Sequence, residues 1–162
     1  MTQEIHLRQM KETDLQSVYE LVQNTIQVSY ADVYPPEAIE FFKNYHNQDN
    51  ILKDATSGYS IVAESDGLIL VTGTLLVMNV RRVYIVPQQH HQGIGKLIVK
   101  KLEQKAKSLG LEKLDLLASL KSRTFWEAMG FVFAGEFFIP VANDKKLIYY
   151  EMLKHYQKGD ST

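Results

Sequence analysis

Residues 83–102 read VYIVPQQHHQGIGKLIVKKL, and this stretch decides how the chain folds. Its apolar start predicts a strand that ends at Pro87. A polar loop follows and closes on Gly93-Ile94-Gly95, and the helical spacing of apolar residues then continues to a capping Gly110. We expect one face of this helix to carry Ile94, Leu97, Ile98, Lys101, Leu102, Lys105, Ala106 and Leu109.

The start of this helix is suited to binding an anion. The first turn of a helix has N–H groups without helical partners and carries a partial positive charge. Glycine has no side chain to keep a phosphate away from the backbone. We therefore expect a diphosphate to bind the amides of about His91–Lys96. Taken alone, the same loop is also explained as a glycine-rich turn that only begins a helix.

Two common phosphate-binding motifs do not fit this loop. A P-loop requires a first glycine where the chain has His90, and a hydroxyl residue where it has Leu97. A dinucleotide-binding fingerprint requires a third glycine where the chain has Ile98. The loop therefore belongs to another class of anion site.

The residues before this segment predict helices first. Residues 4–10 alternate as a short strand, and a helix capped by Thr13 or Asp14 follows. Its apolar face consists of Leu15, Val18, Leu21, Val22 and Ile26. Residues 30–36 break this helix, and a second one begins near Glu37. The second helix is expected to bury Ile39, Phe41 or Phe42, and Tyr45.

The hydrophobic period then changes from that of a helix to that of a strand. Residues 47–57 are polar and weakly patterned, and no element is assigned to them. Strands are expected at Tyr59–Glu64 and Leu68–Met78, joined by the turn Ser65-Asp66-Gly67, and again at Val80–Val86.

The residues after residue 110 predict a strand, a short helix and a final strand pair. The strand is expected at Lys113–Ala118, and the helix at 121–129, closed by Gly130. The final pair is expected at Phe131–Ile139 and Leu147–Leu153. Helices and strands in this order predict an α+β fold around a mixed sheet.

The composition fits one globular domain over residues 1–162. With 18 basic and 19 acidic residues the net charge is −1, which favours no nucleic-acid or membrane partner. Cysteine is absent, which excludes disulfides, thiolate metal sites and cysteine nucleophiles. The N-terminal residues lack a signal-peptide pattern, and the apolar runs are too short to span a bilayer. We therefore expect a cytoplasmic protein.

Two segments resemble the signatures of a known superfamily. Val83–Pro87 followed by Gln92–Leu97 resembles the acetyl-CoA motif of the GNAT superfamily of N-acetyltransferases. Residues 117–131, LASLKSRTFWEAMGF, resemble its second signature, which ends in an aromatic pair, a helix and Gly-Phe. The resemblance implies a mostly antiparallel twisted sheet flanked by helices. It also implies that the sheet splays at one parallel strand pair, here about 80–86 and 113–118.

The resemblance also implies where acetyl-CoA, the acyl donor, binds. Its pantetheine would pair with the backbone of Tyr84, Ile85 and Val86, in the gap between the splayed strands. An N–H near Ile85 or Val86 would polarise the thioester carbonyl. An amine would enter from the other side, attack the carbonyl directly and expel the thiolate. The remaining cofactor contacts would come from His91, Gln92, Gly93, Ile94, Gly95, Lys96, Ser119 and Thr124.

Three positions depart from the family pattern. His90 stands where the phosphate loop usually begins with arginine or glutamine. Trp126 stands where many relatives have a tyrosine that protonates the thiolate, and indole has no useful acidity. Asn79 stands where relatives often have a glutamate base, although its amide can hold a water that relays a proton.

Other side chains near the expected acceptor site are candidates for proton transfer. They are Tyr30, Tyr34 and Glu37, although for each of them a role as a packing or surface residue is the favoured interpretation. Arg81 and Arg82 are expected to line the acceptor cleft and to favour an anionic substrate, with one of the two facing solvent.

The sequence leaves three functions open. The first is an N-acetyltransferase, monomeric or homodimeric, that acts on a small-molecule or peptide amine. The second is a non-catalytic acyl-CoA-binding module, which the missing acid and base at the usual positions favour. The third is a nucleotide-binding domain, which the two failed fingerprints disfavour. No metal is expected, because His90-His91 has no third ligand nearby in the sequence.

Overall fold

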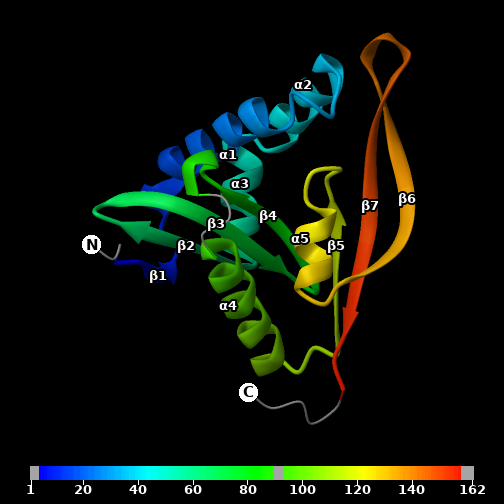
Figure 1. The fold of residues 1–162 in the computed structure, drawn as a ribbon. Coiled ribbons are helices and arrows are strands. Elements are labelled where there is room, and N and C mark those ends of the chain that lie inside the picture. Colours follow the sequence, from blue (N-terminus) through cyan, green and yellow to red (C-terminus); the bar gives the residue numbers. More distant parts are fainter. Residues whose placement is uncertain (1–3, 90–92, 158–162) are drawn as a thin grey trace.

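The computed structural model describes residues 4–89 and 93–157, which fold around a seven-stranded sheet (Figure 1). The order of the strands across the sheet is β1-β2-β3-β4-β5-β7-β6. The strands are β1 (His6–Gln9), β2 (Tyr59–Ser65), β3 (Leu68–Leu76), β4 (Asn79–Ile85), β5 (Lys113–Ala118), β6 (Val132–Val141) and β7 (Lys145–His155). The α-helices are α1 (Leu15–Ser29), α2 (Pro36–Tyr45), α3 (Gln48–Ser57), α4 (Ile94–Ser108) and α5 (Arg123–Ala128). Short 3-10 turns follow β1, β4 and β6, at Glu12–Asp14, Pro87–Gln89 and Ala142–Asp144.

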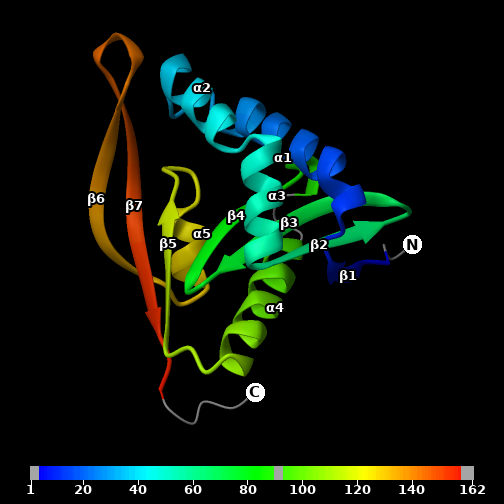
Figure 2. The same cartoon turned by 180° about the vertical axis from the view of Figure 1, so that it is seen from behind.

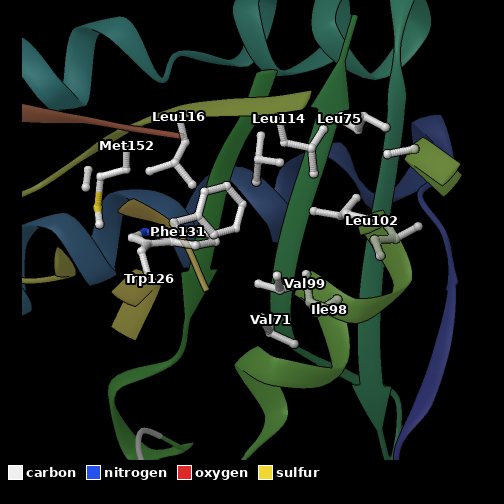
Figure 3. Close-up of a cluster of buried hydrophobic side chains, with 14 of the residues drawn as sticks. Val71, Leu75, Ile98, Val99, Leu102, Leu114, Leu116, Trp126, Phe131 and Met152 are labelled. Carbon is white, nitrogen blue, oxygen red and sulfur yellow. The ribbon is translucent and has the colours of Figure 1, made fainter. Parts of the chain in front are cut away.

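Helices cover both faces of this sheet. On one face α4 and α5 close a buried apolar cluster, in which Ile98 and Val99 of α4 lie near Val71 of β3 (Figure 3). On the opposite face α1 and α3 pack on the strands, and α2 continues towards the β6–β7 hairpin (Figure 2). Val22 and Val62 belong to the buried cluster of this second face. The two faces therefore have separate cores.

The sheet parts between β4 and β5. These strands form the parallel pair of the described sheet, and their register contains a single residue pair, Asn79 with Asp115. Beyond that pair β5 continues alongside β7 up to Ala118, whereas β4 continues alongside β3 up to Ile85. The two strands therefore separate towards their carboxyl ends, as the resemblance to the GNAT superfamily implied.

A β-bulge in β4 accompanies this separation. The register with β3 shifts between Thr72 and Thr74, so that Arg82 and Val83 both lie opposite Gly73. Arg82 has a φ of 54°, which is the left-handed region that a residue with a side chain rarely adopts. A Cβ at Gly73 would lie 2.6 Å from Cγ2 of Ile98, so glycine is required where α4 crosses the bulge.

The structure confirms the predicted fold class, a mixed sheet with one parallel pair and flanking helices. It also confirms the predicted turn before β3, where Asp66 and Gly67 both have positive φ. Among the described residues, no helix is both long enough and apolar enough to cross a membrane.

Helix α3 was not predicted from the sequence. Asn47 caps this helix by accepting a hydrogen bond from the Asn50 amide at 2.8 Å, and the helix buries Ile51 and Asp54. Because one of its two buried side chains is a carboxylate, the helix lacks an apolar stripe. The partner of that carboxylate lies far away in the sequence, so the pattern of residues 47–57 could not reveal it.

Three expected core positions are wrong. Leu97 and Leu109 of the α4 segment are exposed, and Val99 is buried instead. The apolar stripe of α4 therefore runs through Ile98, Val99 and Leu102, rotated slightly from the predicted face. Tyr45, expected in the core, is 48% exposed at the end of α2.

Candidate active site

A cleft of about 1060 Å³ lies where β4 and β5 part, and residues from both faces of the sheet line it. From the α1–α3 face come residues such as Tyr30, His46 and Tyr84. From the α4–α5 face come residues such as Thr124 and Phe125. Because the strands separate here, two molecules approaching from opposite faces can meet in one cavity.

The bulge turns two neighbouring arginines towards the same helix. Arg81 Nη1 lies 3.2 Å and Arg82 Nη2 lies 2.9 Å from Oδ2 of Asp54, on α3. In a regular strand successive side chains point to opposite faces, so the sequence predicted that one arginine faces solvent. That prediction is wrong because the extra residue of the bulge places both on one face. Both line the cleft, and Asp54 neutralises part of their charge.

Arg82 also begins a chain of hydrogen bonds that ends inside the cleft. Its Nε donates to Nδ1 of His46 at 2.9 Å, and Nε2 of His46 lies 3.2 Å from the Tyr84 hydroxyl. Burial, and then the nearby arginines, lower the pKa of His46 to about 3, so the ring is neutral. Since Nδ1 accepts from Arg82, the proton of the neutral ring is on Nε2 and points to Tyr84.

Tyr30 continues this chain across the gap. Its hydroxyl interacts with Tyr84 of β4 and with Ser119, which directly follows β5, and both contacts lower the pKa of Tyr30, by less than burial raises it. Ser119 Oγ donates in turn to Oγ of Ser122 at 3.1 Å. Burial raises the pKa of Tyr30 and that of Tyr84, so both phenols keep their protons near neutral pH. This chain of hydrogen bonds therefore positions protons and supplies no base.

Tyr34 and Glu37, two further candidates for proton transfer, lie outside the cleft. The Tyr34 hydroxyl donates to the Ile148 carbonyl at 2.7 Å and accepts from the Leu120 amide at 3.0 Å. These bonds tie the start of α2 to β7 and to the β5–α5 connection, so Tyr34 supports the fold. Glu37 accepts a hydrogen bond from Asn143 at 2.9 Å near the end of the β6–β7 hairpin.

Asn79 borders the cleft at its closed end. Its Nδ2 donates to Oδ1 of Asp115 at 2.7 Å, and its Oδ1 accepts from Nε of Arg81 at 2.8 Å. Both ends of the amide are therefore occupied by protein groups, and the residue holds β4 and β5 together where they still pair. The expectation that Asn79 holds a catalytic water is not supported by this geometry.

The start of α4 faces the other side of the sheet. Gly93 precedes the helix with a φ of 78°, and a Cβ built on it would meet no atom of the described residues within 4 Å. Gly95 differs, because a Cβ there would lie 2.6 Å from Cδ1 of Ile85 and 3.1 Å from Cε1 of Phe125. Gly95 thus permits close packing of α4, whereas Gly93 leaves open space beside the first turn.

The other predicted cofactor residues have different surroundings. Ile94 is buried, Lys96 is exposed, and Thr124 lines the cleft. The Val86 amide donates to the Leu70 carbonyl at 2.9 Å, so it is engaged within the sheet and is a poor candidate for polarising a thioester. His91 and Gln92 lie outside the described residues.

Trp126 is a core residue that also reaches the cleft. Its ring lies 5.0 Å from that of Phe125 and 5.3 Å from that of Phe131, edge to face in both cases. Figure 3 shows Trp126 beside Phe131. The side chain is 6% exposed, which fits the packing role suggested by the sequence.

Asp54 and His46 were missed by sequence reasoning. Neither has a neighbour in the sequence with which it could form a motif. A buried carboxylate and a buried imidazole only become recognisable as site residues once the bulge brings Arg82 to both of them. Within residues 4–89 and 93–157, no group of three His, Cys, Asp or Glu side chains is arranged to hold a metal ion.

Comparisons with known proteins agree with this architecture. The sequence profile of the acetyltransferase (GNAT) domain matches residues 30–140. Among curated proteins, no sequence matches the chain.

Solved structures share the fold at low sequence identity. A GCN5-related N-acetyltransferase from Rhodopseudomonas palustris superposes with a TM-score of 0.86 at 19% identity, over 96% of this chain and 98% of that one. The PaiA N-acetyltransferase from Thermoplasma acidophilum, solved with coenzyme A, has a TM-score of 0.78 at 19% identity, over 94% and 99%. YncA from Salmonella typhimurium, solved with acetyl-CoA, has a TM-score of 0.71 at 14% identity, over 97% and 96%.

The buried imidazole is expected to make stability depend on pH. His46 has a pKa of about 3 when folded, against 6.5 when exposed, so the unfolded chain holds more protons between these values. The free energy of unfolding should therefore fall as the pH drops below about 6.5. This slope should reach about 1.4 kcal/mol per pH unit, and His46→Asn should remove it.

Urea unfolding between about pH 5 and pH 7 measures this slope. His155→Asn, at an exposed position, is the matched control and should keep the slope of the wild type. Equal slopes in His46→Asn and the wild type would contradict a buried neutral imidazole.

Proposed function

The chain belongs to the GNAT acetyltransferase family and is an acetyl-CoA-dependent acyltransferase; from this premise we propose that it acetylates a primary amine of a small molecule or peptide. The amine nitrogen attacks the thioester carbonyl directly. The C–S bond breaks, the amine loses a proton, and the products are an N-acetyl amine and coenzyme A. The single observation that carries this proposal is the cleft between β4 and β5, which is lined from both faces of the sheet.

Acetyl-CoA fits the α4–α5 face. The first turn of α4 begins where β4 ends, so its amides can hold the diphosphate while the pantetheine follows the parted strand. The open space beside Gly93 supports this position for the phosphates. Lys96 is exposed on the same turn and adds a positive charge. Thr124 lines the cleft and is a polar contact for the cofactor.

The amine fits the α1–α3 face, where Tyr30 spans the gap. The chain from Arg82 through His46 directs the Tyr84 proton towards Tyr30, and the Tyr30 proton towards Ser119. The Tyr30 oxygen then has a lone pair left over, which can accept a hydrogen bond from an N–H of the attacking amine. This bond would aim the nitrogen lone pair at the carbonyl carbon.

Because this chain of hydrogen bonds contains no base, the amine must arrive as the free base. The pKa of His46 is far too low, and those of Tyr30 and Tyr84 are too high, for any of them to take a proton near pH 7. The proton lost by the amine therefore passes to solvent.

Turnover is tested by free-thiol release with acetyl-CoA and a panel of primary amines and short peptides. We expect equal amounts of thiol and acetylated amine with at least one acceptor. Below the pKa of that amine, kcat/KM should rise about tenfold per pH unit, because only the free base attacks. Saturable binding of acetyl-CoA without thiol release across the panel would instead support a non-catalytic acyl-CoA-binding module.

The diphosphate position is tested by Gly93→Val. The new side chain would enter the open space beside the first turn of α4 and should raise the Kd for coenzyme A at least about tenfold. Gly67→Val is the matched control, because Gly67 has the same φ of 78° and, among residues 4–89 and 93–157, also has no atom within 4 Å of an added Cβ, but lies in the β2–β3 turn. If titration calorimetry gives both variants the same affinity for coenzyme A, the diphosphate does not bind at the start of this helix.

The role of Tyr30 is tested by Tyr30→Phe, which keeps the ring and removes the hydroxyl. Loss of one hydrogen bond to the amine should lower kcat/KM for the acceptor about tenfold, with little change in KM for acetyl-CoA. Tyr34→Phe is the control: it should lower the melting temperature, because the Leu120 amide loses its partner, and leave kcat/KM unchanged. If the two variants have equal kcat/KM, Tyr30 does not contact the amine.

A further inference from the structure

The mouth of the cleft on the acceptor side is apolar. Val28 of α1 and Phe41 and Tyr45 of α2 all line it, with exposed fractions of 57%, 36% and 48%. Isolated apolar residues on a surface need no explanation, but three that converge on one cavity do. On the opposite wall Ile139 and Tyr149 of the β6–β7 hairpin line the same cavity.

The aromatic rings form a continuous path into the cleft. Phe41 and Tyr45, one helical turn apart, have parallel rings with centroids 6.5 Å apart and planes 9° apart. The ring of Tyr45 meets His46 at 5.0 Å, and His46 meets Tyr84 at 5.4 Å, both edge to face. This path leads from solvent to Tyr30, where we place the attacking amine.

The charges around the cleft do not suit a second ammonium group. The charged residues that line it are Asp32, Arg81, Arg82 and Lys121. Asp32 lies 2.8 Å from Nζ of Lys121, and Asp54 is shared by the two arginines. Within the described residues, every carboxylate at this site therefore already has a cationic partner. A distal ammonium would lose hydration without gaining a counter-ion.

We propose that the acceptor is a small aromatic alkylamine, with one primary amine on a short alkyl arm and no second positive charge. This inference rests on the proposed function and narrows it to one class of substrate. The aromatic ring lies between α2 and the β6–β7 hairpin, against Phe41 and Tyr45. The arm carries the amine past His46 to the Tyr30 oxygen, and the ring contacts supply affinity without any hydrogen bond to the rest of the acceptor.

The test compares kcat/KM for 2-phenylethylamine, ethylamine, spermidine and a short peptide with a free N-terminus. We expect 2-phenylethylamine to exceed each of the others by at least about tenfold. Phe41→Ala should lower its kcat/KM about tenfold and leave that of ethylamine unchanged, because ethylamine does not reach α2. Phe138→Ala removes an aromatic ring that is 52% exposed on β6 but does not line the cleft, and should change neither.

The outcomes separate this inference from the proposed function. If the enzyme prefers spermidine or the peptide, the inference of an aromatic acceptor is overturned, while the proposed N-acetyltransferase function stands. Thiol release with none of the amines overturns the proposed function. In that case calorimetric titration of 2-phenylethylamine into the coenzyme A complex still tests the aromatic binding site between α2 and the β6–β7 hairpin. Binding by the wild type that Phe41→Ala weakens supports it, and no binding by the wild type overturns it.

Discussion

The ion pair between Arg82 and Asp54 is the interaction on which the rest of this structure depends. Arg82 occupies a left-handed backbone conformation inside β4, which costs a residue with a side chain of the order of 1–3 kcal/mol. Its guanidinium is buried, and a buried cation is stable only with a partner and hydrogen bonds. Asp54 supplies the charge and His46 the acceptor, at 2.9 Å each. Together they hold the bulge in a conformation that the strand would otherwise avoid.

The bulge decides what each face of the sheet presents at the gap. Before it, Val80 packs into the core beneath α4; after it, Tyr84 packs into the core beneath α1. The inserted residue brings Arg81 and Arg82 to one face, and so concentrates the polar groups of β4 on the acceptor side. On the other face Gly73, beneath the bulge, lets α4 lie close to the sheet. One local irregularity thus places both the hydrogen-bonded chain and the helix that we assign to the phosphates.

The hydrogen-bonded chain from Arg82 to Ser119 is rigid, and each of its groups keeps one protonation state near neutral pH. Arginine is a permanent donor, so the Nδ1 of His46 must accept, and the direction of each following hydrogen bond is then fixed. Burial keeps the imidazole neutral and both phenols protonated. Such a chain orients a reactant without exchanging protons with it. The cleft is therefore organised around polar groups that keep one protonation state near neutral pH.

Residues 83–131 were sufficient to predict the class of fold, because their two signatures depend only on residues that are neighbours in the sequence. A strand that ends in proline, a glycine before a helix and a Gly-Phe after another helix are all determined by neighbouring residues. The same local rules predicted β5 with its observed bounds, Lys113–Ala118. They also led to Asn79 and Tyr34 as candidate catalytic residues, since both have suitable chemistry at a plausible place in the sequence.

The tertiary structure alone decided which polar groups meet in the cleft. His46, Asp54 and Arg82 are separated by a helix and two strands, and no periodicity links them. A bulge adds one residue to a strand without changing its apolar pattern enough to be noticed, yet it reverses the face of every side chain that precedes it. The sequence by itself therefore determined the sheet and the helix start after β4. Packing between distant segments decided which polar groups line the cleft on the α1–α3 face, because burial and ion pairing depend on residues that only folding brings together.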